Sequence, residues 1–431
     1  MSNPPVSRHD AIHIISALRQ GVVPSRGLHH YAVGQDRELG ILLDALRDVA
    51  DGHSAFKGIR GGYGSGKTFI ISRLAEEALQ QGFAVSQVSL NRDKASLHML
   101  ERLYQGVLQH LRIRGTEGNG LSTLLDRWIG SAEEYVIEVD GIPEHRESLL
   151  REAVSQRIEV MLGEVARERP SYSAALKAYH RASLTGDHAL KRDVLGWLMA
   201  DPHASTRQLT GVRGQIQASD TLAYLRELTR MLRQLKRPGL LIILDELDEM
   251  RHLKRDLRQR AWANLRDLLD EIGRGVPGLF LVMAGTPEVY DDRRGVTELP
   301  PLEQRLGDPT QQTAHPNLRG PQLPLPTFSQ AQLARVMDRL EELWETAGGQ
   351  QSRLPDGFAA SLADGWTQLL GSRSPRIAIR EYISVLDRAR DYPDFDPVRE
   401  YRYALESLTL SPEETEAHTG VPVAVADDEL F

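Results

Sequence analysis

The chain has 431 residues, of which 41% are hydrophobic and 26% are charged, and its formal net charge is −8. This composition is typical of a folded globular protein and argues against disordered and fibrous classes. The length, about three times that of an average domain, allows one large α/β domain with helical additions, or two to three modules. The negative charge argues against coating of nucleic acid along the whole surface, so any contact with DNA is expected to be local.

The sequence contains no cysteine, which excludes disulfides, thiolate zinc sites and thiol catalysis. No segment reaches the roughly 18 to 20 uncharged apolar residues that a membrane-spanning helix needs. The first residues also lack the basic start and apolar centre of a signal peptide. We therefore expect a cytoplasmic protein without membrane contact.

Residues 1–30 are expected to form a short N-terminal module with one helix. Ser7 and Asp10 have the spacing of a capping box, and apolar residues then recur at helical intervals. Gly21 and Pro24 are typical of the residues that end a helix. The pattern predicts one amphipathic helix between Ser7 and Gly21.

Residues 31–326 are predicted to form an α/β core, because short apolar or alternating runs of strand length recur along them. Two of these runs are apolar throughout, as expected for strands buried on both faces of a parallel sheet. The predicted strands are residues 55–60, 83–90, 240–244, 278–284 and, more weakly, 321–325. Between the second and third strands, residues 95–236 have an almost wholly helical pattern and are predicted to be a large helical insertion.

Residues 327–395 are predicted to form a helical lid subdomain. Helical patterns follow Ser329, recur near 356–370 and continue from Ser374 to about Tyr392. Residues 396–431 are expected to be a C-terminal extension. Its acidic end, residues 411–431, has little to bury and is expected to be disordered.

A glycine-rich loop follows the first predicted strand and precedes a helix. Its residues satisfy the full spacing of a phosphate-binding loop: Gly61, Gly62, Tyr63, Gly64, Ser65, Gly66, Lys67 and Thr68. Glycines allow turns that point backbone N–H groups at a phosphate, and the following helix adds its positive end. We expect Lys67 to bridge the β- and γ-phosphates and the Thr68 hydroxyl to ligate Mg²⁺.

Asp245 and Glu246 directly follow the apolar run 240–244. Ligands of open α/β sheets bind at the carboxyl ends of strands, and we expect the phosphate loop and these two acids to follow neighbouring parallel strands. Asp245 is expected to hold Mg²⁺ through water, and Glu246 is expected to be the general base for the attacking water. The chain lacks an Asn-Lys-x-Asp motif that reads guanine, so ATP is favoured over GTP.

With these motifs in place, residues of about 30–392 resemble the AAA+ superfamily, in particular its origin-recognition and Cdc6-like branch. The resemblance implies an α/β fold: an AAA+ P-loop NTPase core with a parallel sheet, a large helical insertion and a C-terminal helical lid. It implies that the segment containing Tyr31 and Val33 frames adenine, and that Thr286 is the sensor-1 residue that bonds the γ-phosphate or the attacking water. The ATP-binding set expected on this basis is Tyr31, Val33, Gly61 to Thr68, and Phe69.

Two arginines gain roles from the same resemblance. The segment 302–306 is similar to the region that supplies an arginine finger to a neighbouring subunit, which makes Arg305 the candidate. The triplet Ser374-Pro375-Arg376 is similar to sensor 2, where the serine N-cap and the proline place Arg376 in the first helical turn, aimed at the nucleotide. Each arginine also has an ordinary explanation as a surface salt-bridge residue.

More narrowly, the opening segment 14–24, the loop at 59–68 and the long helical insertion are similar to the BrxD-like ATP-binding proteins of BREX systems. This resemblance implies an ATPase of bacterial anti-phage defence. It also implies action with DNA and with a helicase or methyltransferase partner.

A group of cations follows Asp245 and Glu246 at spacings that would place them on one helical face. A face of this kind is suited to lining a channel for DNA phosphates. The alternative is a solvated helix whose cations are balanced by acidic neighbours. The four cations are Arg251, Lys254, Arg255 and Arg258.

The leading hypothesis is an ATPase that assembles into a ring or filament on DNA and hydrolyses ATP between subunits. A second hypothesis is a nucleotide-gated signalling scaffold in which ATP turnover is incidental. A third is a regulator of DNA transposition. Glu246 favours the first reading, because a switch that needs no hydrolysis has little use for a carboxylate at that position.

Overall fold

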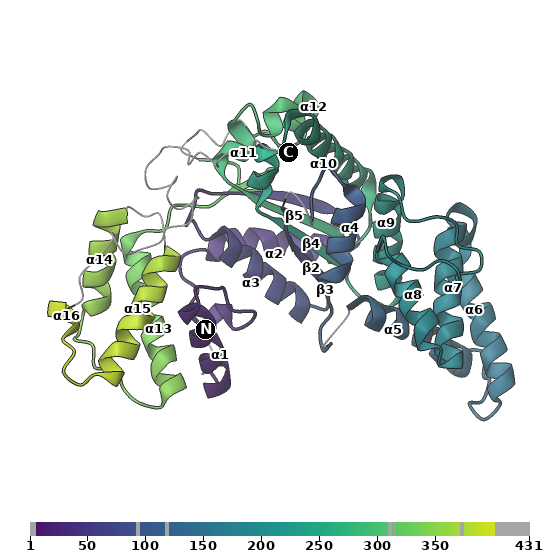
Figure 1. Ribbon diagram of the computed structural model, residues 1–431, viewed down its shortest axis with the longest axis horizontal. Helices are drawn as coiled ribbons and strands as arrows, with labels where there is room; N and C mark the ends of the chain where they lie inside the picture. Colours follow the sequence, from purple (N-terminus) through teal and green to yellow (C-terminus); the bar gives the residue numbers. More distant parts are fainter. Residues whose placement is uncertain are drawn as a thin grey trace.

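A computed structural model of the chain describes residues 6–91, 95–116, 120–308, 313, 315–370 and 375–400. Figure 1 shows a central sheet with helices around it, a helical arm on one side and a smaller group of helices on the other. The predicted α/β fold, with its parallel sheet, helical insertion and C-terminal helical lid, is confirmed. The acidic end predicted to be disordered, 411–431, lies outside the described residues.

Within the described residues, six strands form one sheet in the order β3-β2-β4-β5-β1-β6. Strands β4 and β5 are buried along their whole length, because helices cover both faces of the sheet. The parallel strands agree with the runs predicted from the sequence. They are β1 (Ala55–Arg60), β2 (Ala84–Ser89), β4 (Leu240–Asp245), β5 (Leu279–Gly285) and β6 (Gln322–Pro324).

Alternate residues of the central strands pack into two cores, as the twofold period of a strand requires. Leu241 and Phe280 belong to one core, whereas Ile242 and Leu281 belong to the other. The helices of the first core are α2 (Asp36–Ala50) and α3 (Lys67–Gln80), and those of the second include α4 (Leu100–Gln109) and α10 (Arg255–Gly275).

The strand order corrects one prediction. Strands β1 and β4, which precede the phosphate loop and Asp245, are not neighbours, because β5 lies between them and pairs with both. An apolar run identifies a buried strand but carries no information about its place in a sheet. The end of β5 therefore lies between the two predicted halves of the site.

The helical arm is formed by α5 (Gly120–Glu138), α6 (Glu147–Glu168), α7 (Pro170–Thr185), α8 (His188–Leu198) and α9 (Ala218–Gln234). The pattern over 95–236 was interpreted as almost wholly helical, but the segment also contains β3 (Leu111–Arg112), which pairs antiparallel with β2. A strand of this length has too little alternation to be recognised in a sequence.

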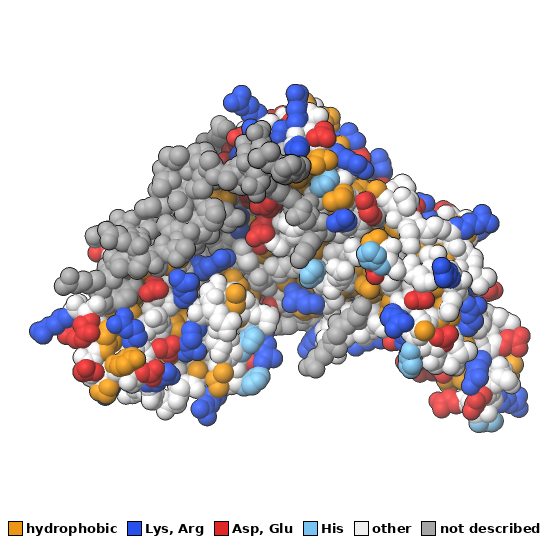
Figure 2. Space-filling model, viewed as in Figure 1, with side chains coloured by type: hydrophobic (Ala, Val, Ile, Leu, Met, Phe, Trp, Pro, Cys, Tyr) orange, Lys and Arg blue, Asp and Glu red, His pale blue; other side chains and the backbone are white. Residues whose placement is uncertain are grey.

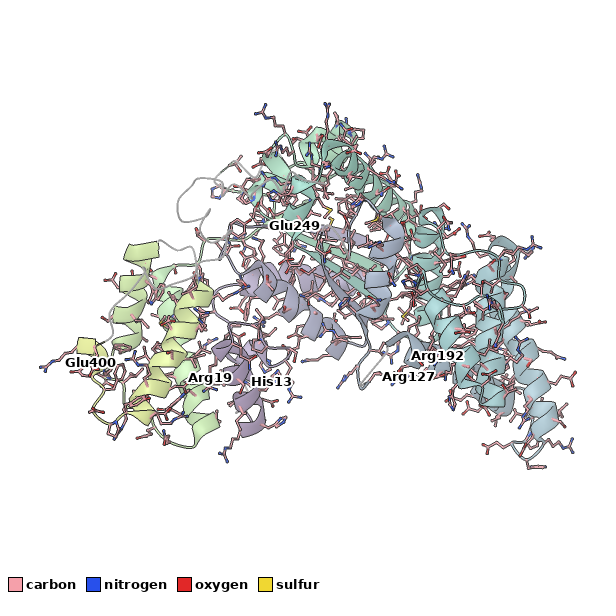
Figure 3. All side chains as sticks on the ribbon, viewed as in Figure 1. His13, Arg19, Arg127, Arg192, Glu249 and Glu400 are labelled. Atoms are coloured by element: carbon pink, nitrogen blue, oxygen red, sulfur yellow. The ribbon has the colours of Figure 1, made fainter. Side chains whose placement is uncertain are left out.

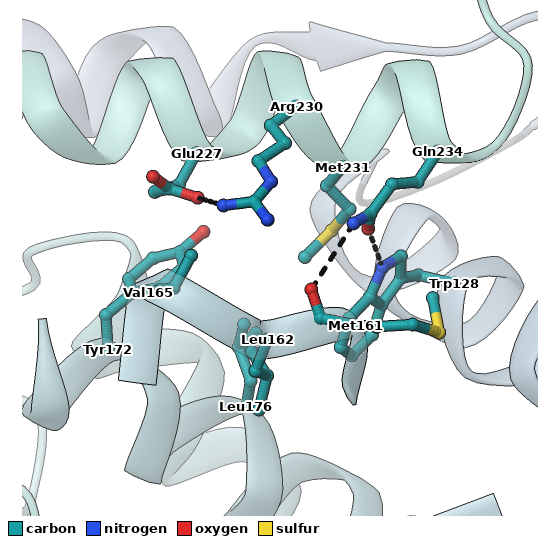
Figure 4. A pocket seen from close by; sticks show the side chains of 10 residues that line it. All are labelled: Trp128, Met161, Leu162, Val165, Tyr172, Leu176, Glu227, Arg230, Met231 and Gln234. Carbon is teal, nitrogen blue, oxygen red and sulfur yellow. Dashed lines mark hydrogen bonds and ion pairs between the residues drawn. The ribbon is translucent and has the colours of Figure 1, made fainter. Parts of the chain in front are cut away.

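Hydrogen bonds made by side chains connect three helices of the arm around a small cavity (Figure 4). Trp128 Nε1 donates to Gln234 Oε1 at 2.7 Å, and Gln234 Nε2 donates to the carbonyl oxygen of Met161 at 3.3 Å. Glu227 and Arg230 line the same cavity 3.8 Å apart. Its volume of about 20 Å³ is that of a single water site, so the arm has no ligand-sized pocket here.

The lid contains α13 (Gln330–Gly348), α14 (Phe358–Leu370) and α15 (Pro375–Asp391), followed by α16 (Pro397–Glu400). Helix α1 (Arg8–Arg19) packs into the same apolar cluster, in which Ile14, Met337 and Tyr382 are fully buried. Arg19 also pairs with Asp387 at 2.6 Å. The N-terminal helix therefore completes the core of the lid.

Short elements connect the larger ones, and most of them follow the carboxyl ends of β4 and β5. They are η1 (Leu28–His30), η2 (Leu247–His252), α11 (Pro287–Asp291), η3 (Val296–Glu298) and α12 (Pro300–Leu306). Among the helices that the structure describes, none combines the length and apolar character needed to cross a membrane.

Candidate functional site

The phosphate-type loop connects β1 to α3, and its backbone requires glycine. Gly64 and Gly66 have φ angles of 74° and 86°, in the left-handed region that residues with side chains rarely adopt. Gly66 is also the N-cap of α3, so the loop ends at the positive end of that helix. A Cβ atom at Gly61 would lie 2.3 Å from the Ser65 hydroxyl, which leaves no room for a larger residue.

Lys67 is the first residue of α3, and its side chain lies against the loop. Nζ donates to the carbonyl oxygens of Gly61 at 2.7 Å and Gly62 at 3.2 Å. It also lies 5.3 Å from the ring centroid of Tyr63. The ammonium group is therefore held beside the backbone that is suited to binding phosphate.

Thr68 and Asp245 come from α3 and β4 and meet at the carboxyl ends of the strands. Thr68 Oγ1 donates to Asp245 Oδ2 at 3.1 Å. The Asp245 side chain is buried, and this burial raises its pKa, although hydrogen bonds from the backbone of Glu246 and from Thr68 act in the opposite direction. Hydroxyl and carboxylate oxygens are the donors that Mg²⁺ prefers, so the pair fits a magnesium site.

Glu246 has a φ angle of 60°, which is uncommon for a residue other than glycine. Its side chain is exposed, and its backbone N–H donates to Asp245 Oδ1 at 2.9 Å. The Ser89 hydroxyl, at the end of β2, donates to Glu246 Oε2. Strained backbone of this kind is concentrated at functional sites. Ser89 was not predicted as a site residue, because only the pairing of β2 with β4 brings it to Glu246.

Thr286 follows β5 and is almost completely buried. Its backbone N–H donates to the Asp248 carboxylate at 3.1 Å, and its hydroxyl donates to the same group. Asp248 therefore orients Thr286. The sensor-1 role of Thr286 stays a prediction.

The segment before α2 lies between the lid and the loop. The Tyr31 ring is 5.3 Å from the ring of Phe69, and both residues, like Val33, pack in or against the apolar cluster of the lid. Burial raises the pKa of the Tyr31 hydroxyl. Gln35, which the sequence did not single out, is buried and donates from Nε2 to the carbonyl oxygen of Ser65 at 3.0 Å. It ties this segment to the phosphate-type loop.

The two predicted arginines differ in their surroundings. Arg305, on α12, is bonded to the Asp270 carboxylate and to the carbonyl oxygen of Pro301. Arg376 is exposed in the first turn of α15, which Pro375 begins as predicted. The predicted N-cap, Ser374, lies outside the described residues.

The four cations predicted to share one helical face do not do so, and that prediction is wrong. Arg251 lies in η2 and pairs with Asp292 at 3.3 Å, whereas Arg258 lies in α10 and pairs with Glu298 at 2.6 Å. The extended backbone at Leu253 separates the two helices, so the helical spacing is interrupted. The two remaining cations are Lys254, the N-cap of α10, and Arg255, its first residue.

The family model described as BREX system ATP-binding protein BrxC/D matches residues 6–404. None of the curated proteins matches the chain. A solved structure of the ORC2 protein of Aeropyrum pernix, in ADPNP–ADP complexes, is similar at 16% sequence identity with a TM-score of 0.42. The similarity covers 84% of this chain and 64% of the ORC2 chain. This chain therefore spans less than two thirds of the length of the ORC2 chain.

Proposed function

Because the chain belongs to the BrxC/D family of BREX-system ATP-binding proteins, we propose that it hydrolyses ATP at the carboxyl ends of β1, β4 and β5. The observation that carries this proposal is the hydrogen bond of 3.1 Å from Thr68 to Asp245. It joins the glycine-rich loop and the acidic pair, which lie far apart in the sequence. Nucleotide binding alone requires only the loop, whereas hydrolysis also requires the acids.

Each side chain has a role in this proposal. The loop N–H groups and Lys67 bind the β- and γ-phosphates of ATP, and Tyr31 and Val33 contribute to the adenine side. Thr68 and Asp245 would hold Mg²⁺, and the bound ion would neutralise charge on the phosphate oxygens.

Glu246 accepts a proton from the water that attacks the γ-phosphorus, while the bond from that phosphorus to the β–γ bridging oxygen breaks and ADP leaves. The exposed position of Glu246 supports this role, because the carboxylate has access to water. The hydrogen bond from Ser89 occupies one of its two carboxylate oxygens, Oε2.

Further parts of the proposal concern the assembled protein. Thr286 senses the γ-phosphate, and Asp248 holds Thr286 in place. Arg376 binds the nucleotide from the lid. Arg305 acts on the site of a neighbouring subunit in a ring or filament.

The protein acts in anti-phage defence, in contact with DNA and with a helicase or methyltransferase partner. Family membership supports the defence role.

Phosphate release by the purified chain with ATP and Mg²⁺ tests the central claim. Steady turnover by the wild type and its loss in Lys67→Ala and Glu246→Gln is the expected result, with ATP still bound by Glu246→Gln. Glu134→Gln is the matched control, because it removes an equal charge from an exposed position on α5. Turnover that persists in Glu246→Gln, or binding of ATP without any turnover in the wild type, contradicts the proposal.

A further inference from the structure

Five arginines form what we call the basic patch, at the base of the helical arm. Three of them lie near the amino ends of the parallel strands, at the other end of the strands from the phosphate-type loop, and two lie on helices of the arm. They are Arg112 on β3, Arg114 after it, Arg127 on α5, Arg192 on α8 and Arg237 just before β4.

Part of the basic patch is built around the turn that joins α3 to β2. Arg114 Nη1 donates to the carbonyl oxygen of Gln80 at 2.9 Å, and Arg237 Nη1 donates to that of Gly82 at 3.0 Å. Arg112 lies on β3, the edge strand that pairs with β2. Two guanidinium groups are therefore anchored to one turn, with a third on the adjacent strand.

The patch continues onto the arm through α5 and α8. Burial lowers the pKa of Arg237, and the positive charge of the nearby Arg127 lowers it further. An ion pair of 2.8 Å between Lys191 and Asp126 holds α8 against α5 one residue before Arg192 and Arg127. Figure 3 shows Arg127 and Arg192 at the margin of the arm near its junction with the sheet.

Within the described part of the chain, Arg112, Arg127 and Arg192 form no ion pair or side-chain hydrogen bond. The acid next to Arg127 in the sequence, Asp126, already bonds Lys191 and the hydroxyl of Tyr179. Lys and Arg side chains are visible along this margin in Figure 2. The chain as a whole has a net charge of −8, so this cluster of arginines is a local exception.

We propose that the basic patch binds the phosphodiester backbone of DNA. Guanidinium groups match phosphate oxygens with two parallel N–H donors, and they bind phosphates without reading base sequence. The negative net charge of the chain restricts contact with DNA to a small part of the surface, and a single basic patch agrees with this restriction. The inference rests on the DNA association in the proposed function, and it names the surface responsible.

The position of the patch also gives a physical link to the nucleotide site. Helix α3 begins at Lys67 beside the phosphate-type loop and ends at Gln80, whose carbonyl oxygen accepts from Arg114. DNA phosphates that contact the patch therefore act on the far end of the helix that carries the loop. DNA is expected to change the rate of ATP turnover through this helix.

The test measures binding of a labelled DNA duplex by fluorescence anisotropy over a range of salt concentrations. The variant is Arg127→Gln with Arg192→Gln, because both side chains are exposed and unpaired among the described residues, so the fold does not depend on them. The control is Arg181→Gln with Arg207→Gln, which removes the same charge from exposed positions elsewhere in the insertion. The variant is expected to bind about tenfold more weakly, and its salt slope is expected to be less steep by about two, since each phosphate contact contributes about 0.9.

Equal affinity and equal salt slope for the wild type, the variant and the control overturn the inference. If the wild type releases phosphate from ATP but binds no DNA, the inference about the patch is overturned and the ATPase proposal is unaffected. Binding of polyglutamate, but not DNA, that depends on Arg127 and Arg192 overturns it in favour of an acidic protein partner. If the wild type binds DNA through Arg127 and Arg192 but does not turn over ATP, the inference about the patch is supported and the ATPase proposal is contradicted.

Discussion

The Ser89 hydroxyl donates a hydrogen bond to Oε2 of Glu246, across the pair of strands β2 and β4. The carboxylate proposed to activate water is thus held by a side chain from a neighbouring strand. In this arrangement Ser89 competes with water for the same carboxylate oxygen. The hydrogen bond is therefore expected to restrain turnover rather than to support it.

Replacement of Ser89 by alanine tests this restraint. Loss of one hydrogen bond, with a net value of about 1 kcal/mol, is expected to raise basal phosphate release about two- to fivefold. ATP affinity is expected to stay unchanged, because Ser89 lies outside the phosphate-type loop. The double variant Ser89→Ala with Glu246→Gln must remain inactive if the effect passes through Glu246. A slower Ser89→Ala enzyme means instead that Ser89 holds Glu246 in its working position.

Burial raises the pKa of Asp245, which leads to a prediction about stability and pH. A raised folded pKa means that the ionised carboxylate destabilises the folded chain. This penalty is absent below the ordinary value of 3.8, grows as the pH rises toward the raised value, and is constant above it. Asp245→Asn is therefore expected to raise the Tm at pH 7 in the absence of nucleotide and Mg²⁺.

The measurement is thermal unfolding of both proteins over a series of pH values. The gain in Tm is expected to shrink as the pH falls, while Mg²⁺-dependent phosphate release is lost at every pH. A variant that is less stable than the wild type at pH 7 means that the Thr68 hydrogen bond outweighs the cost of burying the charge.

The sequence predicted the features of this protein that depend on local patterns. The loop from Gly61 to Thr68 is recognisable because the geometry of a phosphate site fixes the residue types at each position. The strands 240–244 and 278–284 are recognisable because burial on both faces leaves an uninterrupted apolar run. These signals were sufficient to identify the fold and to select Asp245 and Glu246.

Features that depend on which segments become neighbours were not predicted. Ser89 and Asp248 gain their partners only through the order of the strands and the turn after β4. The spacing of Arg251 and Arg258 indicated one helical face, but the break at Leu253 separates them. Each then pairs with an acid about 40 positions further along the chain.

The buried pair of Arg258 and Glu298 leads to a test of that correction. Their side chains are only 10% and 12% exposed, so removing one charge leaves the other buried without its partner. Arg258→Gln is expected to lower the free energy of unfolding by about 3 kcal/mol. Lys254→Gln, at the exposed N-cap of α10, is expected to change it by less than about 0.5 kcal/mol. Urea unfolding measures the free energy of unfolding of both variants. If the two substitutions lower it equally, Arg258 behaves as a surface cation.

Arg305 is the residue on which the proposed assembly mainly depends. Its guanidinium binds Asp270 of the same chain, so an action on a neighbouring subunit requires this ion pair to open or to share the arginine. If the proposal holds, Arg305→Ala keeps the affinity for ATP but loses turnover by about 1000-fold, because the missing charge stabilises the transition state of the neighbour's reaction. Asp270→Asn is the control that frees Arg305 without removing it, and it is expected to retain activity.

The decisive experiment mixes two inactive variants, Arg305→Ala and Glu246→Gln. A mixed assembly contains interfaces at which an intact Glu246 on one subunit meets an intact Arg305 on the next, so part of the ATPase activity is expected to return. The recovered activity is expected to increase with protein concentration, because the active interface forms between chains. Exchange of subunits is established first with differently labelled wild-type chains. If exchange occurs and no activity returns at any ratio, Arg305 acts within its own subunit or serves only its ion pair with Asp270, and the ring or filament loses its support in the sequence.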